Sequence, residues 1–316
     1  MKAIQFFAIT ALGAALFASC SNEEELATGS YPSDNLIRVT AGVNNDMTRG
    51  DEAVTPTPLT KDFSLTVVNK TNDKFSYANE IFSLNGTEWS CGKNLLWQNL
   101  STPVEIVALY PAKDANTFSG VYSKEDKSYG TITYGVNPDQ STAAEADDLL
   151  LYHNASYVPE NDRKDGKLNI QFDHAFCRVD IIVTIGTEFN ATDGLAVNPI
   201  QGIRVEGTKI SADIGFASTE PFFTVTPSES GDAASITPTR RDFTPAANAT
   251  EQAVAKYSCI VIPQTADLKV LLHTSDREFE WTGKQMELVS GKQYTLQLNM
   301  TNKSATARKF ILRERK

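Results

Sequence analysis

The side chains best suited to acid–base or metal chemistry are three histidines, and they lie far apart at His153, His174 and His273. Zinc sites take their ligands in pairs a few residues apart, and these separations do not match that spacing. His174 stands between Phe172 and Phe176, and side chains two residues apart share one face of a strand. This pattern favours a hydrogen-bonded histidine in or near the core over a metal ligand or a general base. We therefore expect no metal site.

Acidic side chains could support two other kinds of chemistry. A pair of carboxylates can hydrolyse a glycosidic bond, but any acidic chain offers such pairs. Glu145 with Asp147-Asp148 could bind calcium weakly, whereas a solvated loop explains the same residues, because a hard-cation site needs about six or more oxygens in one geometry. The sequence contains no nucleophile elbow, phosphate-binding loop, His-Glu-x-x-His pair or catalytic-cysteine signature. We expect a protein that is not an enzyme and needs no cofactor.

The residue whose surroundings indicate a chemical modification is Cys20. It follows an early cation, Lys2, an apolar run from Ile4 to Phe17 and the small residues Ala18-Ser19. Such a run is an export signal, and it is shorter than the roughly 20 apolar residues that a membrane span needs. We assign residues 1–19 to a lipoprotein signal peptide whose removal leaves Cys20 as the acylated N-terminus. An ordinary signal peptide, cut after a small residue, is the alternative.

Lipidation would hold the protein at a membrane, because each buried acyl methylene contributes about 0.8 kcal/mol. Residues 20–35 are polar, acidic and rich in turn formers, which predicts a flexible tether. Glu23-Glu24-Glu25 resembles the acidic signal that sends Bacteroidetes lipoproteins to the outer face of the outer membrane. A merely soluble tether is the alternative explanation of these glutamates.

The net charge limits the class of partner. It is −10 for the whole chain and −11 without the first nineteen residues, which carry Lys2 as their one charge. An acidic surface argues against nucleic acid and anionic lipid, because phosphate contacts need clustered Lys and Arg. Hydrophobic residues make up 41% of the chain, which is enough for two packed cores in about 300 residues.

Three cysteines remain after Cys20. An odd and sparse set is not a disulfide framework, and the spacing of these residues fits no metal site. Cys177 and Cys259 lie inside apolar strand patterns, so we expect them to be small buried hydrophobes. Cys91 is the third.

The chain beyond the tether alternates repeatedly between apolar and polar residues, with β-branched and aromatic side chains between Gly, Asn, Asp and Pro clusters. Many short strands with turn signals between them predict an all-β protein built from β-sandwiches. Gln140 to Leu151 is the best candidate for a short helix, although the same residues could line a loop. The expected strands are Leu36–Val43, Phe63–Val68, Val104–Tyr110, Thr131–Tyr134, Leu168–Phe172, Cys177–Ile185, Gln201–Val205, Phe222–Val225, Tyr257–Ile262, Lys269–Thr274, Glu278–Trp281 and Gln293–Met300.

We predict two tandem β-sandwich domains, at residues 36–185 and 186–300, followed by a basic C-terminal tail at 301–316. The stretch from Gly186 to Pro199 is the best boundary, because it is rich in Gly, Asn, Thr and Asp. Cys177–Ile185 alternates at first and then becomes wholly apolar, which is typical of a central strand covered on both faces. The chain shows no internal repeat.

Three groups of motifs, in this order and spacing, resemble the Bacteroidetes fimbrillin family, the subunits of strand-exchange pili and their lipoprotein relatives. The first is a tryptophan before a strand that ends on an aromatic residue and proline. The second is an aspartate-leucine-leucine element with a later phenylalanine-x-histidine-alanine strand. The third is an isoleucine-proline-glutamine element with a later glycine-lysine-x-tyrosine hairpin. The matching residues are Trp97 with Val104–Pro111, Asp148-Leu149-Leu150 with Phe172–Ala175, and Ile262-Pro263-Gln264 with Gly291–Tyr294.

The resemblance implies two transthyretin-like β-sandwich domains and a non-enzymatic fimbrial subunit. It further implies an adhesive protein of the cell surface and fimbrium, lipid-anchored in the outer membrane. Its partners would be other fimbrial subunits, the outer membrane through the N-terminal lipid, and a receptor or glycan on a host or bacterial surface.

Family resemblance also implies a maturation step. A protease cuts after a basic residue in the first loop, the N-terminal strand leaves, and a donor strand from another subunit fills the vacated groove. Here Leu36–Val43 would leave, and Arg49 is the residue after which we expect the cut, because turn formers flank it and loop tips attract proteases. Alternatively, Arg49 is an ordinary surface cation.

The C-terminal tail departs from the pattern of a repeating stalk subunit. Thr301–Lys316 has six cations, one glutamate and one short apolar patch at Phe310-Ile311-Leu312. A donor strand needs alternating apolar side chains to fill a groove, and this tail offers few. We therefore expect a tip, accessory or anchor-like subunit, or a relative that does not polymerise.

A second class of function stays open. Surface lipoproteins of such bacteria include glycan-binding partners of nutrient-uptake systems, which often present exposed aromatic side chains to sugars. Trp89, Trp97 and Trp281 could form such a platform. In the fimbrillin interpretation they pack at strand ends instead, so their burial discriminates between the two classes.

Overall fold

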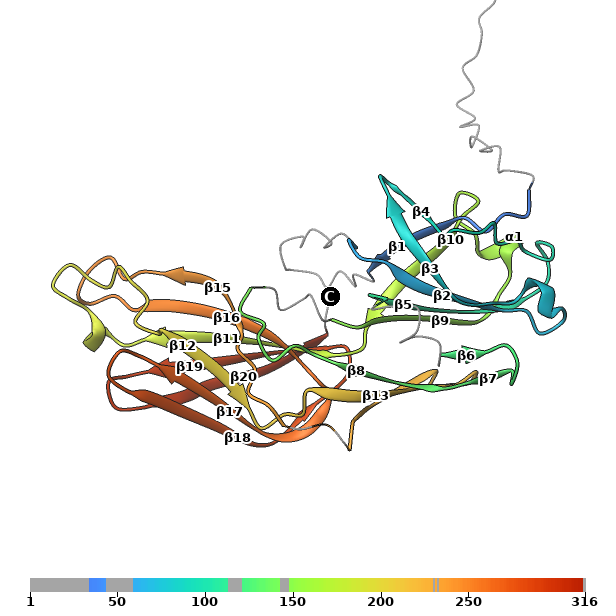
Figure 1. Ribbon diagram of the computed structural model, residues 1–316. Coiled ribbons are helices and arrows are strands. Elements are labelled where there is room, and N and C mark those ends of the chain that lie inside the picture. The colour runs from blue at the N-terminus through green and yellow to red at the C-terminus, as the bar shows by residue number, and fades with distance from the viewer. Residues whose placement is uncertain are drawn as a thin grey trace, which may run out of the picture.

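The computed structural model describes residues 34–43, 59–112, 121–142, 148–229, 231 and 233–314 of the 316-residue chain. Nearly all regular structure in these ranges is β-strand, so the prediction of an all-β protein is confirmed (Figure 1). The short exceptions include helix α1 (Pro159–Asp162) and the 3-10 turns η1 (Asp73–Phe75) and η3 (Thr187–Phe189). Within the described residues, no helix is both long and apolar enough to cross a membrane.

Seven strands form a closed barrel, which we call the first unit. Their order around the barrel is β1-β10-β9-β5-β2-β3-β4, and β1 is parallel to β10. The strands are β1 (Val39–Val43), β2 (Phe63–Val68), β3 (Tyr77–Asn85), β4 (Glu88–Ser90), β5 (Val104–Tyr110), β9 (Leu150–Tyr157) and β10 (Leu168–His174).

The remaining strands form the second unit, which has several open sheets. A five-stranded sheet has the order β15-β16-β11-β19-β20, and two three-stranded sheets have the orders β12-β17-β18 and β14-β13-β8. A hairpin of β6 and β7 is separate from them. The strands are β6 (Tyr122–Ser123), β7 (Ser128–Tyr129), β8 (Thr131–Gly135), β11 (Cys177–Ile185), β12 (Gly202–Glu206), β13 (Ser211–Phe216), β14 (Phe223–Pro227), β15 (Thr239–Thr244), β16 (Ala253–Val261), β17 (Gln264–His273), β18 (Glu278–Leu288), β19 (Lys292–Met300) and β20 (Ala305–Glu314).

Strand β11 is central in the five-stranded sheet, between antiparallel β16 and parallel β19. Its residues alternate strictly between buried and half-buried, so one face packs on the core and the other is only partly covered. Full cover on both faces is found at β5 instead. There Ile106 and Ala108 belong to the barrel core, while Val107 and Leu109 belong to the core of the second unit.

The two units are interlocked along the chain. After β5 the chain enters the second unit, where β8 pairs with β13, and it then returns to the barrel as β9 (Figure 1). The sheet pairing therefore differs from the ranges expected from the sequence, 36–185 and 186–300, because β8 and β11 both join the second unit. Whether both units are transthyretin-like sandwiches stays a prediction.

Two further segments differ from expectation. Leu150 and Leu151, the last two residues of the candidate helix at Gln140 to Leu151, are the first two of strand β9, and residues 143–147 lie outside the described residues. The expected tail at 301–316 contains β20, which pairs with β19 from Lys292↔Glu314 to Met300↔Ala305. The turn before β19 agrees with the sequence, since Gly291 has a φ of 70°.

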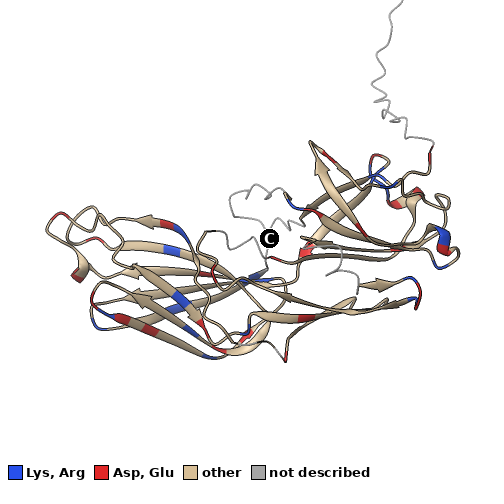
Figure 2. Cartoon of the chain, viewed as in Figure 1, with Lys and Arg blue, Asp and Glu red and all other residues tan. Residues whose placement is uncertain are grey.

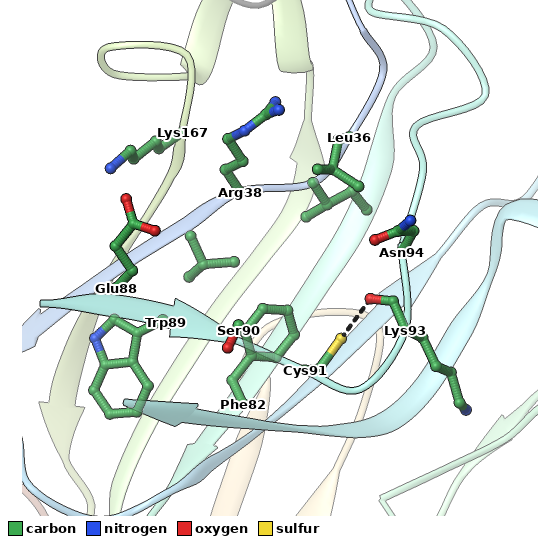
Figure 3. Close-up of a pocket in the computed structure, with 12 residues that line it drawn as sticks. Leu36, Arg38, Phe82, Glu88, Trp89, Ser90, Cys91, Lys93, Asn94 and Lys167 are labelled. Atoms are coloured by element: carbon green, nitrogen blue, oxygen red, sulfur yellow. Dashed lines mark hydrogen bonds between the residues drawn. The ribbon is translucent and has the colours of Figure 1, made fainter. Parts of the chain in front are cut away.

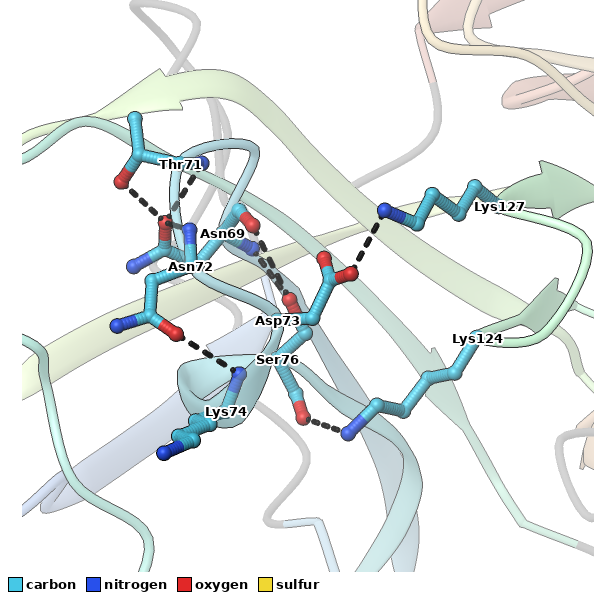
Figure 4. Close-up of polar contacts among 8 residues, drawn as sticks. All are labelled: Asn69, Thr71, Asn72, Asp73, Lys74, Ser76, Lys124 and Lys127. Atoms are coloured by element: carbon cyan, nitrogen blue, oxygen red, sulfur yellow. Dashed lines mark hydrogen bonds and ion pairs between the residues drawn. The ribbon is translucent and has the colours of Figure 1, made fainter.

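Lysines of the β6–β7 hairpin contact a loop of the barrel (Figure 4). The Nζ of Lys124 donates to the carbonyl oxygen of Ser76 at 2.6 Å, and the Nζ of Lys127 lies 2.7 Å from Oδ2 of Asp73. The loop is shaped from within by Asn69, whose Oδ1 accepts hydrogen bonds from the backbone amides of Thr71 and Asn72 at 3.0 Å. The β6–β7 hairpin of the second unit is thus bonded to the barrel loop that contains η1.

A buried carboxylate lies beneath this contact. Glu105 is 1% exposed, its Oε1 lies 2.8 Å from Nε2 of His153, and its Oε2 lies 3.2 Å from Nζ of Lys70. The ring of Phe222, from the second unit, lies 3.7 Å from the His153 ring. Burial raises the pKa of Glu105, but hydrogen bonds from His153, Tyr129 and Lys70 outweigh burial and lower this pKa overall.

Replacing Glu105 by Gln should change how stability depends on pH. Because the folded-state pKa of Glu105 lies below its unfolded value of about 4.3, the carboxylate stabilises the fold above that pH. This stabilisation is lost as the pH falls through the lower folded-state pKa. We expect the free energy of unfolding, from urea denaturation, to fall less steeply below about pH 5 in Glu105→Gln than in the wild type.

The same measurement on Glu125→Gln, an exposed position in the turn of the β6–β7 hairpin, gives the control and should follow the wild-type curve. An unchanged slope in Glu105→Gln would contradict the role given to this carboxylate.

Candidate functional site

Strand β1 is held unequally on its two edges. On one edge all five of its residues, Val39 to Val43, pair with β10, from Val39↔Leu168 to Val43↔Phe172. On the other edge one pair, Val39↔Trp89, joins β1 to β4 and closes the barrel. Backbone hydrogen bonds along a strand edge are what a neighbouring strand can replace. Among the described strands of the barrel, β1 and β4 thus share the fewest paired residues, and ahead of β1 a bridge from Leu36 to Leu96 adds to this closure.

The side chains that β1 and the residues just before it place in the core are aliphatic, with no aromatic ring among them. Ile37 and Val39 are 5% and 4% exposed, and Ala41 and Val43 are half-buried against the same core. They occupy alternate positions, as expected for a strand with one buried face. This alternation is what the sequence predicted for Leu36–Val43, although the paired strand begins at Val39.

Without β1, a groove would open between β10 and β4, and its apolar inner wall would include the inward-facing side chains of β10, the sheet neighbour of β1. Leu168, Ile170 and Phe172 are fully buried, and the ring of Phe172 lies 5.7 Å from that of Phe63. Exposing these side chains would cost roughly 25 cal/mol per Å² of apolar surface. If β1 left, another strand with alternating apolar side chains would have to cover them.

A gap of about 230 Å³ lies along the weak edge of β1 (Figure 3). Phe82 and Trp89 form its apolar wall, with Val39 on the side of β1. Charged side chains lie around its mouth; they are Arg38, Glu88, Lys93 and Lys167. The gap exists because β4 is only three residues long and pairs with β1 at a single residue.

Two ion pairs hold the charges at this mouth. The Arg38 guanidinium donates to both carboxylate oxygens of Asp34, at 2.6 and 2.8 Å, which raises the pKa of Arg38 and lowers that of Asp34. Lys93 donates to Oε1 of Glu80 at 2.8 Å, and this hydrogen bond raises the pKa of Lys93. Arg38 and Lys93 are both at least partly exposed. Their ion pairs therefore orient the side chains more than they stabilise the fold.

Charged residues of both signs are interspersed along the described chain (Figure 2). In that part of the chain, no group of three or more His, Cys, Asp or Glu residues could hold a metal ion. The candidate calcium ligands Glu145 and Asp147 lie outside the described residues, while Asp148 is engaged by a histidine. The site is thus built from backbone edges and apolar side chains.

The histidines are hydrogen-bonded, as predicted for His174. Its Nδ1 lies 2.6 Å from Oδ2 of Asp148, and the His174 side chain is 12% exposed. His153 binds Glu105, and Nε2 of His273 lies 2.6 Å from Oε2 of Glu278 at the surface. The three residues lie in different places and do not form one site.

The residues predicted to be modified lie outside the described part of the chain. Cys20, Glu23-Glu24-Glu25 and Arg49 precede or follow the described range 34–43. Lipidation at Cys20 and cleavage after Arg49 therefore stay predictions. The gap beside β1 was not predicted, because the sequence signal of β4 is only three residues long.

Each of the three tryptophans packs on a core. Trp97 is 2% exposed and stacks on Tyr157 with ring centroids 5.7 Å apart. Trp89 is half-buried, with its ring centroid 4.8 Å from that of Phe63. Trp281 is half-buried against the core of the second unit. This packing agrees with the fimbrillin interpretation and offers no shared aromatic platform for a glycan.

Comparison with known proteins agrees with this architecture. The family model described as fimbrillin-like matches residues 41–310. The chain belongs to the fimbrillin-like family. No curated protein matches the sequence significantly.

Solved structures from Bacteroides share the fold. A candidate cell adhesion protein from Bacteroides ovatus aligns with a TM-score of 0.58 at 13% identity, over 90% of this chain and 99% of that one. A second candidate cell adhesion protein, from Bacteroides uniformis, gives 0.58 at 14% identity, over 89% and 99%. A fimbrial protein from Bacteroides vulgatus gives 0.54 at 14% identity, over 88% and 99%. At these identities the likeness concerns the fold.

Thiol labelling should distinguish the cysteine at the gap from those in the core. Cys91 is half-buried at the gap, whereas Cys177 and Cys259 are fully buried, and burial raises the pKa of the Cys259 thiol to about 12. In a chain that carries Cys20→Ala, a maleimide should label Cys91 in the native state and the other two only after unfolding, as read by mass spectrometry. Fast native labelling of Cys177 or Cys259 would contradict the packing described.

Proposed function

We propose that this protein is a non-enzymatic fimbrial subunit of the cell surface, of tip, accessory or anchor-like type, and that β1 occupies the site where a strand of another subunit binds. The observation that supports this most is the unequal attachment of β1, with five residue pairs to β10 and one to β4. Beside β1, the inward face of β10 is apolar and fully buried, and a strand with alternating apolar side chains would be needed to keep it covered. Family membership supports the same class of function.

The C-terminal strand supports an accessory rather than a repeating role. A donor strand has to be available to a neighbour, whereas β20 pairs with β19 along its whole length. As a donor strand it would also offer few alternating apolar side chains to fill a groove, because Phe310-Ile311-Leu312 is its one large apolar patch. β20 is the edge strand of its sheet, and detaching it would leave the edge of β19 unpaired, so this chain should receive a strand more readily than it gives one.

In this proposal, the order of Cys20, β1 and Arg49 along the chain links membrane anchoring to subunit assembly. Cys20 and β1 both precede Arg49 along the chain. A cut after Arg49 would therefore separate the lipid and β1 from the rest of the protein in one step. Uncut protein is anchored with a closed groove, and cut protein can exchange β1 for a partner strand and leave the membrane.

Removing the lipidated cysteine should release the protein from membranes. Cys20→Ala leaves no site for acyl chains at the N-terminus, so cell fractionation should move the protein from the membrane to the soluble fraction. Cys91→Ala is the matched control and should stay with the membrane. Replacing Glu23-Glu24-Glu25 by Gln should reduce labelling on whole cells without changing membrane association. Persistent anchoring of Cys20→Ala would refute lipidation at that residue.

Trimming at Arg49 tests the assembly role. Mild trypsin should cut after Arg49, and a mixture of trimmed and untrimmed protein should form no long homopolymers under the electron microscope, because β20 is a poor donor. Arg49→Gln gives the control, since it should resist this cut. Long homopolymers would show that the tail is a competent donor and that the chain is a stalk subunit.

A further inference from the structure

The gap between β1 and β4 is a part of the binding groove that β1 itself does not fill. Val39 lies at this gap, opposite Leu168 on one side and Trp89 on the other. Its side chain is short, and Phe82 forms the opposite apolar wall. The volume is about 230 Å³, and an apolar cavity of about 150 Å³ already accepts benzene. The gap therefore has room for a phenyl ring at the position of Val39.

Charge at the mouth of the gap argues for an apolar occupant rather than an ion. Arg38 is paired with Asp34, and Lys93 is paired with Glu80. Glu88 and Lys167, the other two charged residues at the mouth, carry opposite charges. A small anion or cation would meet no excess of the opposite sign, whereas an apolar side chain would cover Phe82 and Trp89.

We propose that β1 is an under-filled occupant of its own groove, and that the strand which replaces it carries a large apolar side chain, such as Phe, at the register position of Val39. This inference rests on the proposed replacement of β1 by a partner strand. The larger side chain gives the partner strand an advantage that β1 lacks, because it buries more apolar surface at the same backbone pairing. The gap thus defines which strands the subunit accepts.

Peptide competition tests this in the full chain. A specific protease site inserted after Arg49 allows a single cut, after which the fragment with β1 is held only by non-covalent contacts. Peptides with the sequence of residues 36–46 are then added, and native mass spectrometry measures how much fragment each displaces. The set contains the native sequence, Val39→Phe, Val39→Ala and Val43→Phe. Val43 lies at the other end of β1, so Val43→Phe is the matched control.

We expect Val39→Phe to displace the fragment at about a tenfold lower concentration than the native peptide, and Val39→Ala to need a higher one. Val43→Phe should bring no gain. If Val39→Phe is no better than the native peptide, the gap does not select the partner, although strand replacement stands. If no peptide displaces the fragment at any concentration, strand replacement itself fails, and this inference fails with it.

The uncut chain offers an independent measurement. Val39→Phe should raise the midpoint of thermal unfolding, since the ring fills existing space, whereas Val43→Phe should not. A lower midpoint for Val39→Phe would show that the gap cannot take the ring and would overturn the inference.

Discussion

The structure depends on one wall that two cores share. Strand β5 places Ile106 and Ala108 in the barrel and Val107 and Leu109 in the second unit, so each unit completes the apolar cover of the other. Neither side of this wall can be opened without exposing apolar surface, at roughly 25 cal/mol per Å². The path of the chain reinforces the wall, because β8 crosses into the second unit and β9 returns. The barrel is therefore rigidly supported on the side of β5 and β9.

This support explains how β1 can be replaceable in a stable protein. The position of β10 is set by its pairing with β9 and by its direct continuation into β11, which lies at the centre of the five-stranded sheet. The apolar face of β10 would thus keep its place whether or not β1 covers it. On its other edge β1 pairs with β4 at Val39↔Trp89 alone, the preceding Leu36 bridges Leu96, and a gap lies beside these contacts. Weak pairing between β1 and β4 is compatible with a stable fold, because β5, on the opposite side of the barrel, packs into both cores.

A buried charge is found where the two units touch. Glu105 is buried but engaged by His153 and Lys70, so its charge is compensated at the joint rather than left in an apolar interior. The hairpin lysines Lys124 and Lys127 add surface contacts to the same region. The β1 site, in contrast, uses charge only at its mouth. Binding there is governed by shape and backbone pairing, which is what a site for an extended strand requires.

The sequence by itself determined the class of fold and the position of many strands. The expected bounds of β2, β5 and β11 coincide with the observed ones, because period-two alternation and β-branched runs depend only on neighbouring residues. The family motifs around Phe172–Ala175 and Gly291–Tyr294 were likewise local patterns. Only the tertiary structure decided which strands pair, since backbone hydrogen bonds are the same for every residue and leave no mark in the sequence. The assignment of β8 and β11 to the second unit, the single pair that closes the barrel at Val39, and the gap beside it all follow from such long-range pairing.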